Sequence, residues 1–175
     1  KTGEEAATYV EKIRSIVSFL DVSDGKMEEG SLRCDVNVSV KEKGSEKLGT
    51  KVEIKNLNSI ANIEKAIDFE ISRQSVLIDC GGKVIQETRR FDEGSQETVV
   101  MRVKTDAVDY KYFTEPNIPP IKLSKEFIDN AIKTSPELAE VRLAKYQSLG
   151  LNEYDSSLLL VNKETSDYYD EALKT

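Results

Sequence analysis

The sequence contains no histidine and no tryptophan, and only two of its 175 residues are cysteine. Without histidine, the chain cannot by itself form a Ser-His-Asp triad, a Cys-His nucleophile pair or a zinc site with imidazole ligands. The two cysteines, Cys34 and Cys80, are too few for a disulfide framework and lack CxxC spacing, so we expect both to be reduced structural residues. Any catalysis by this chain must therefore use carboxylates, Lys, Arg, Tyr or a metal ion.

Long apolar runs are also missing. No stretch approaches the ~20 apolar residues that a membrane span needs, and the first residues lack the apolar core of a signal peptide. We therefore expect no membrane association and a location in the cytoplasm or in an organelle matrix. The net charge of −7 argues against a general nucleic-acid binder, although it allows a local basic patch.

The most informative segment runs from Met27 to Val40. In its second half every second side chain is apolar, which predicts a strand with one buried face: Leu32, Cys34, Val36, Val38 and Val40. The positions between them carry Arg33, Asp35, Asn37 and Ser39. Asp and Asn are disfavoured in strands by up to about 1 kcal/mol, so we expect their function to offset this cost.

A second strand is predicted at residues 51–56, where Val52 and Ile54 alternate with charged residues. If the two strands share a sheet, the charged side chains gather on one polar face: Arg33, Asp35, Glu53 and Lys55. Two carboxylates on adjacent strands suit Mg²⁺, which binds one or two carboxylates together with water and phosphate. The alternative is a solvated face on which the carboxylates only form salt bridges.

Later strands carry further charges that could reach the same face, with a solvated strand edge as the alternative: Glu87, Arg89, Arg102 and Lys104. The tyrosines of residues 109–113 could stack on a nucleotide base, or could belong to a loop that closes over a sheet edge.

Helical patterns cover residues 6–20 and a long segment that begins after Asn58 or Ser59 and ends at Gly81-Gly82. Strands are predicted at residues 83–91 and 97–104, and a domain boundary near residue 122. Beyond it, Ser124 and Ser135-Pro136 are predicted helix starts and Gly150 a helix end, followed by helices at 153–161 and 165–173. Both ends of the chain interrupt a pattern, so we expect a piece of a longer protein.

Four segments together resemble one family. They are residues 27–39 (MEEGSLRCDVNVS), 49–59 (GTKVEIKNLNS), 86–89 (QETR) and 109–113 (DYKYF). In this order and spacing they resemble the B subunit of the aspartyl/glutamyl-tRNA amidotransferase, the enzyme that makes Gln-tRNA(Gln) and Asn-tRNA(Asn) from misacylated precursors. The resemblance covers residues 1 to about 122 and continues more loosely after them. Lys111 and Thr114 depart from the Arg and Pro expected there.

The resemblance implies an α+β fold with a largely antiparallel sheet and packed helices. Residues 1–122 would be the C-terminal part of a cradle domain, and residues 123–175 the beginning of an all-α helical domain. In that family the cradle uses ATP and Mg²⁺ to phosphorylate the side-chain carboxyl of tRNA-bound Glu or Asp. Ammonia that the amidase (A) subunit releases from glutamine then displaces the phosphate. The small C subunit and the misacylated tRNA are the other expected partners.

The resemblance also implies roles for individual residues. Asp35 and Glu53 are the candidate Mg²⁺ ligands, and Arg33 and Lys55 the candidate catalytic residues. Glu87 and Arg89 are candidates for cofactor binding. The N-terminal part of the cradle and the C-terminal tail are expected to lie outside this chain, so we expect the chain alone to be inactive.

Two other functions compete with this one. The segment could be a non-catalytic scaffold that docks tRNA or the amidase subunit. It could also be a free-standing Mg²⁺-dependent phosphotransferase, but the sequence lacks a third acidic cluster to complete the ligand set.

Overall fold

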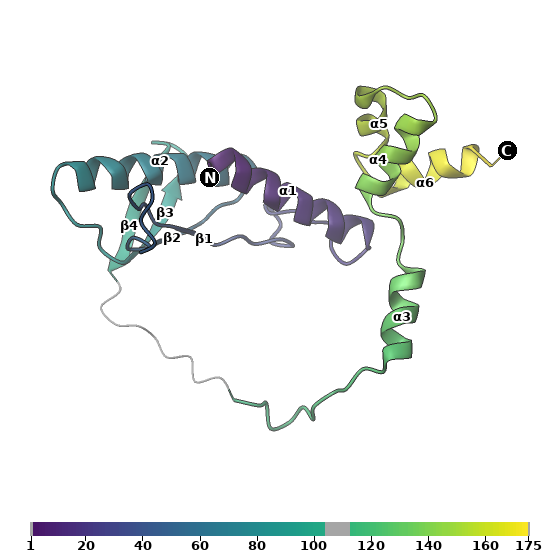
Figure 1. Ribbon diagram of the computed structural model, residues 1–175, viewed down its shortest axis with the longest axis horizontal. Coiled ribbons are helices and arrows are strands. Elements are labelled where there is room, and N and C mark those ends of the chain that lie inside the picture. Colours follow the sequence, from purple (N-terminus) through teal and green to yellow (C-terminus); the bar gives the residue numbers. More distant parts are fainter. Residues whose placement is uncertain (1, 104–112, 175) are drawn as a thin grey trace. The chain divides into compact units, whose positions relative to one another are not determined.

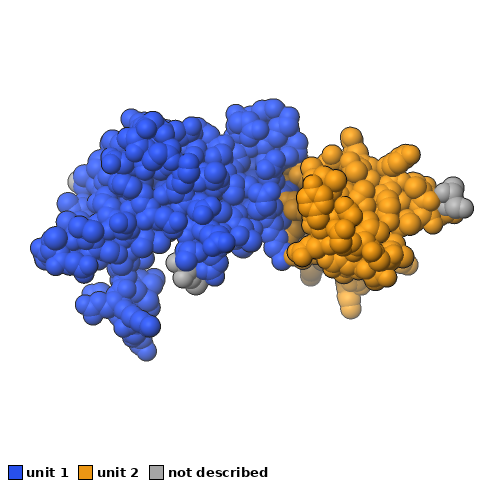
Figure 2. Space-filling model, turned by 90° about the horizontal axis from the view of Figure 1, so that it is seen from above, with its two compact units in different colours: residues 1–14, 24–107 blue, residues 15–23, 108–175 orange. Residues whose placement is uncertain are grey.

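The computed structural model describes residues 2–103 and 113–174. The contacts between residues divide the chain into two compact units. The first consists of residues 1–14 and 24–107, and the second of residues 15–23 and 108–175 (Figure 2). Figure 1 shows the helices and strands, whose bounds are α1 Gly3–Phe19, β1 Val36–Val38, β2 Val52–Lys55, α2 Ile60–Asp79, β3 Glu87–Asp92, β4 Glu97–Val103, α3 Lys125–Thr134, α4 Ala139–Ser148, α5 Glu153–Leu159 and α6 Lys163–Ala172. The predicted boundary near residue 122 stays a prediction.

The four strands form one sheet in the order β1-β2-β3-β4. β1 and β4 pair antiparallel with their neighbours, whereas β2 and β3 are parallel because α2 connects them as a crossover. This arrangement confirms the predicted α+β fold with a largely antiparallel sheet. The register places Glu53 of β2 between Asn37 of β1 and Thr88 of β3.

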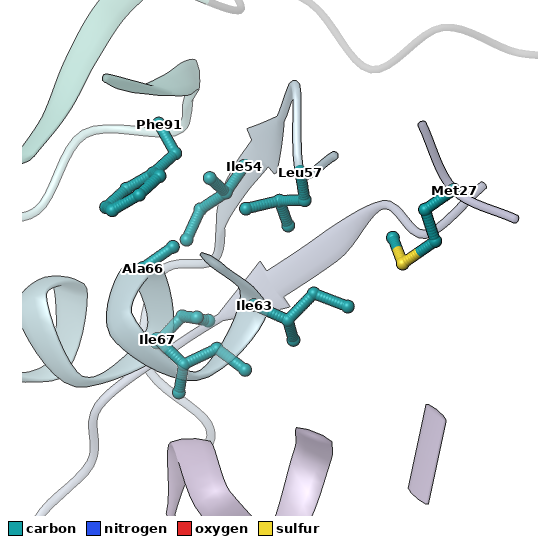
Figure 3. Packing of buried hydrophobic residues seen from close by; sticks show 8 residues of the cluster. Met27, Ile54, Leu57, Ile63, Ala66, Ile67 and Phe91 are labelled. Carbon is teal, nitrogen blue, oxygen red and sulfur yellow. The ribbon is translucent and has the colours of Figure 1, made fainter. Parts of the chain in front are cut away.

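The core lies between α2 and one face of this sheet. Figure 3 shows Ile63, Ala66 and Ile67 of α2 near the side chains of Ile54 and Leu57. The cluster of buried apolar residues also includes Met27, Val38 and Phe91. The helix predicted for this segment is confirmed, and the Ser59 hydroxyl caps it by accepting a hydrogen bond from the Asn62 backbone N–H at 3.2 Å.

The first helix packs against the same core through Ala6 and Val10. At its start the Gly3 backbone N–H donates to the Asp68 carboxylate at 2.9 Å. A Cβ atom at Gly3 would lie 2.4 Å from the backbone oxygen of Glu64, so this close approach to α2 requires glycine.

A buried polar network crosses the core beside the apolar cluster. The fully buried carboxylate of Glu70 on α2 accepts hydrogen bonds from Arg73 Nε at 3.0 Å, Gln74 Nε2 at 2.9 Å and Thr98 Oγ1 at 2.9 Å. The amide of Gln74 also donates to the Val38 carbonyl at 3.2 Å and accepts from the Val40 backbone N–H at 3.1 Å. Glu70 therefore connects α2 to both edges of the sheet.

The pKa of Glu70 reflects this network. Burial by itself raises the pKa, but the hydrogen bonds from Arg73, Gln74 and Thr98, together with the charge of Arg73, outweigh burial and lower it. Glu70 is thus held as a carboxylate in the folded protein.

Two predicted strands are longer than the observed ones. Residues 32–40 alternate in burial as predicted, yet only Val36–Val38 form a strand. The reason is that β2 offers only four residues for pairing, and the Val40 N–H donates to Gln74 instead of to a strand. Likewise β3 begins at Glu87 and not at residue 83.

The second unit contains the helices α3 to α6 and is organised around Arg142. The Arg142 side chain is buried, and its Nη1 atom lies 2.6 Å from both Asp167 Oδ1 and Ser166 Oγ. Its guanidinium carbon lies 5.5 Å from the ring centroid of Phe19, within the range of cation–π attraction. The fully buried Tyr146 donates its hydroxyl to the Ser166 carbonyl at 3.2 Å.

The helix boundaries of this unit confirm two predictions and overturn one. The Ser124 hydroxyl caps α3, and Gly150 follows α4 with a φ of 99°, a left-handed conformation that favours glycine. Ser135 is not the cap of the next helix: it ends α3, where its hydroxyl donates to the Ala131 carbonyl at 2.8 Å, and Leu138 is the N-cap of α4. α4 begins only at Ala139. No helix in residues 2–103 or 113–174 is long and apolar enough to cross a membrane.

We predict that Glu70→Gln lowers the free energy of unfolding by about 3 kcal/mol at neutral pH, because it removes the closer carboxylate partner of Arg73 and leaves its guanidinium with Glu87, at 3.6 Å. Urea denaturation followed by circular dichroism measures the change, with Glu64→Gln on the same helix as the control. A lowered pKa means that the contribution of Glu70 is present above its unfolded value of about 4.3 and is lost as the pH falls through the folded value. The two proteins should therefore converge in stability on acidification, and a pH-independent difference would contradict this account.

Candidate functional site

The face of the sheet that points away from α2 is polar. Val52 and Ile54 are fully buried toward the helix, so strand alternation turns Glu53 and Lys55 to the opposite face. Pairing then places the neighbouring strands' side chains beside them. We call the group on this side the polar sheet face: Asp35, Asn37, Glu53, Lys55 and Thr88.

The charged residues of the polar sheet face meet at Lys55. Its Nζ atom lies 3.6 Å from Asp35 Oδ2 and 3.6 Å from Glu53 Oε1. The Thr88 hydroxyl donates to the other oxygen of Glu53, Oε2, at 2.9 Å. The exposed fraction of the side chains is 17% for Glu53, 33% for Lys55 and 49% for Asp35, so the group is accessible from solvent. The structure brings together three of the six predicted site residues, whose roles stay predictions.

The donor set of this group fits a divalent cation in part. Asp35 and Glu53 place two carboxylates beside the ammonium of Lys55, and Mg²⁺ commonly takes one or two carboxylates and completes its shell with water and phosphate oxygens. Within the described ranges, no three or more His, Cys, Asp or Glu residues gather as a metal site. Asp35 and Glu53 would therefore supply two ligands of an incomplete protein set. The salt bridges expected under the alternative interpretation are present as well.

A cavity of about 330 Å³ adjoins Asp35. Arg33, which is exposed, contributes to the wall of this cavity and so lies beside the polar sheet face. The cavity is lined by two chain segments, within residues 27–35 and 56–58. The lining residues are Met27, Glu28, Glu29, Gly30, Leu32, Arg33, Cys34, Asp35, Asn56, Leu57 and Asn58. A cavity of this size suits a small ligand or part of a larger one.

Backbone geometry helps to form the cavity. Asn56 directly follows Lys55 and has a φ of 60°, which is uncommon for a residue other than glycine and occurs most often in Asn and Asp. Sequence reasoning did not single out Asn56, Asn58, Glu28 or Glu29 as site residues. The signal was present, because all four lie in the two segments that carry the family resemblance.

Glu87 and Arg89 lie on the other face of the sheet. Arg89 Nη1 donates to Glu87 Oε1 at 2.6 Å, and Arg89 Nε lies 3.7 Å from Glu70 Oε2 on α2. The expectation that they share a face with Asp35 and Glu53 is wrong, because alternation along β3 turns Thr88, not its neighbours, toward Glu53. Their assignment to cofactor binding stays a prediction.

The remaining candidates are placed only in part. Arg102 lies on β4 and is exposed. Lys104 and residues 109–112 of the tyrosine-rich segment lie outside the described residues.

Both cysteines are free thiols, as expected. Burial raises the pKa of Cys34, and the negative charge of Asp35 raises it further. Because a thiolate is the nucleophilic form of cysteine, the raised pKa makes Cys34 in the cavity wall less reactive as a nucleophile.

Residues 1–129 match the family model described as the GatB/GatE catalytic domain. The B subunit of the aspartyl/glutamyl-tRNA(Asn/Gln) amidotransferase of Mesoplasma florum is 49% identical over 99% of this chain and 36% of its own length. The corresponding protein of Brevibacillus brevis is 44% identical over the whole chain and 37% of its own length. A chloroplastic/mitochondrial B subunit of the glutamyl-tRNA(Gln) amidotransferase of Physcomitrium patens is 45% identical over 99% of the chain and 31% of its own length. The chain thus spans about a third of these relatives.

We predict that Thr88→Val lowers the free energy of unfolding by about 1 kcal/mol, because the half-buried Glu53 loses a hydrogen bond while the volume of the side chain is kept. Thr88→Ser, which keeps the hydroxyl, should retain the part of this stability that comes from the bond. Urea denaturation measures both, with Thr50→Val in the exposed loop as the control. Equal stability of the Val variant and the parent would show that the bond contributes nothing.

Proposed function

The chain belongs to the GatB/GatE catalytic-domain family, and from this premise we propose that it is part of a tRNA-dependent amidotransferase subunit that activates a carboxyl group. The substrate would be the side-chain carboxyl of Glu-tRNA(Gln) or Asp-tRNA(Asn), and the activating agent ATP with Mg²⁺. The observation that supports this proposal most directly is the convergence of Asp35, Glu53 and Lys55 on one accessible face, next to a cavity.

The reaction has two steps. An oxygen of the substrate carboxylate attacks the γ-phosphorus of ATP, and ADP leaves, which gives an acyl phosphate. Ammonia then attacks the carbonyl carbon and phosphate leaves, which gives the amide. The first step brings two anions together, so catalysis consists mainly of positioning and of electrostatic stabilisation. No histidine is needed for it, and the chain contains none.

The residues of the polar sheet face have distinct tasks in this proposal. Asp35 and Glu53 would hold Mg²⁺, which supplies positive charge to the phosphate oxygens when bound. Thr88 orients Glu53 through its hydrogen bond at 2.9 Å. Lys55, and Arg33 at the cavity wall, are the cations that can contact the anionic groups of the substrates. In this proposal Glu87 and Arg89 support the sheet from its other face.

The source of ammonia and the tRNA contacts lie outside these residues in our proposal. The partners would be the amidase (A) subunit, which hydrolyses glutamine, the small C subunit and the misacylated tRNA. We place the assembly in the cytoplasm, or in an organelle matrix if the source is an organelle.

A non-catalytic docking scaffold is the second candidate. It is favoured by α3, which contains no buried residue and exposes Phe127, Ile128 and Ile132. An apolar helix face of this kind is typical of a surface that another protein segment covers. The two candidates differ in whether the carboxylates of the polar sheet face are needed for chemistry.

We predict that Asp35→Asn and Glu53→Gln each reduce ATP-dependent conversion of Glu-tRNA(Gln) to Gln-tRNA(Gln) by at least about 100-fold, because they remove charge where Mg²⁺ and phosphate would be held. The assay uses the full-length protein assembled with its partners. Glutamine hydrolysis, measured separately, should be retained. Glu42→Gln in the loop between β1 and β2 is the matched control. Unchanged transamidation in both variants would favour the scaffold.

We also predict that the 175-residue chain by itself shows no glutamine-dependent amidation of Glu-tRNA(Gln), since its described residues place only two candidate metal ligands on the polar sheet face. The measurement is the same assay with the chain in place of the full-length protein. Amidation at a rate near that of the assembly would overturn this expectation.

A further inference from the structure

Lys55 has an unusual position between the two candidate metal ligands. Its Nζ atom is equidistant from Asp35 Oδ2 and Glu53 Oε1, at 3.6 Å from each. Both distances exceed the usual range of N–H···O hydrogen bonds, about 2.7–3.2 Å. The ammonium is therefore attracted by two carboxylates without a close hydrogen bond to either of these oxygens.

The neighbouring groups Thr88 and Arg90 do not occupy the position between Asp35 Oδ2 and Glu53 Oε1. Thr88 binds Oε2 of Glu53, so the other oxygen, Oε1, is the one near the ammonium. Arg90 is the register partner of Lys55 on β3, but its guanidinium lies 3.2 Å from Asp92 Oδ2. Lys55 is thus a cation that offsets the repulsion between Asp35 and Glu53.

Glu53 is held more firmly than the ammonium of Lys55. Glu53 belongs to the paired strand β2 and is only 17% exposed, whereas Lys55 carries its charge on a flexible four-carbon stem and is 33% exposed. A cation that bound both carboxylates would lie within a few ångströms of Nζ, and two cations at that range repel each other strongly. The lysine can move away, while Glu53 stays in place.

We propose that Lys55 is an internal substitute for the divalent cation: its ammonium holds Asp35 and Glu53 together until Mg²⁺ binds, and leaves them when it does. This inference rests on the proposed function, in which these carboxylates are the metal ligands. The released ammonium becomes available to the phosphate groups that accompany Mg²⁺. Binding of the metal ion and movement of the Lys55 ammonium toward the phosphates would thus occur together.

A permanent salt bridge would behave differently. If Lys55 served only to position the carboxylates, its removal would let them separate and would weaken binding of a divalent cation. If it occupies the place of the cation, its removal eliminates a competitor and strengthens binding. The sign of the change distinguishes the two roles.

The experiment is a titration of the full-length protein, assembled with its partners, with Mn²⁺ in the absence of nucleotide. Electron paramagnetic resonance counts the bound ions, and the ion at this site is the one that Asp35→Asn removes. We expect Lys55→Met to bind this ion about tenfold more tightly than the parent protein. Lys51→Met removes the same charge directly before β2 and should change the affinity less than about threefold. Lys55→Gln is the second variant in case the Met variant does not assemble.

Equal or weaker binding by the Lys55 variants would overturn the exchange, and so would the absence of any ion that Asp35→Asn removes. These results would not by themselves refute the proposed function, which is tested by the transamidation rates of Asp35→Asn and Glu53→Gln. A tenfold gain in Lys55→Met that disappears in the double variant with Asp35→Asn would establish the exchange at this site.

Discussion

The buried carboxylate of Glu70 is the interaction on which the rest of the first unit depends. A buried charge is tolerated only when hydrogen bonds and an opposite charge surround it. Few arrangements of helix and sheet meet this requirement. Glu70 meets it through Arg73, Gln74 and Thr98, and Gln74 extends the network to β1. The position of α2 on the sheet is fixed in this way, and the orientation of the opposite face follows from it.

The same types of charged residue serve different ends on the two faces of the sheet. Toward α2, Glu87 and Arg89 are buried and pair with each other at 2.6 Å, which suits structural support. Away from α2, Asp35, Glu53 and Lys55 are partly exposed, and Lys55 Nζ lies 3.6 Å from one carboxylate oxygen of each acidic residue. Of the two groups, this second one is accessible from solvent, which binding of an exchangeable cation would require.

Sequence reasoning located the second group but not the first. The alternation of Val52 and Ile54 with Glu53 and Lys55 fixed the orientation of β2, because two fully buried apolar residues leave one way to place that strand. In β3, Phe91 is the only large apolar residue, and charged side chains occupy the other inward positions. Buried residues that are charged give no hydrophobic alternation. The pattern of β3 therefore could not show which face of the sheet Glu87 and Arg89 occupy, because residues of other elements, far along the chain, determine it. The cavity was missed for a related reason, since residues 27–35 and 56–58 meet only in the folded protein.

The polar sheet face also explains how Asp35 and Asn37 are accommodated beside and within β1. Asp35 comes directly before β1, where it needs no strand pairing, and its carboxylate gains an ion pair with Lys55. Asn37 lies within β1, opposite Glu53. The cost in strand propensity, up to about 1 kcal/mol, falls on a segment of only three residues whose neighbours are held by α2. A short β1 is therefore what allows carboxylate and amide oxygens to lie beside β2, and the paired strand holds Glu53 more firmly than the flexible stem of Lys55 holds its ammonium.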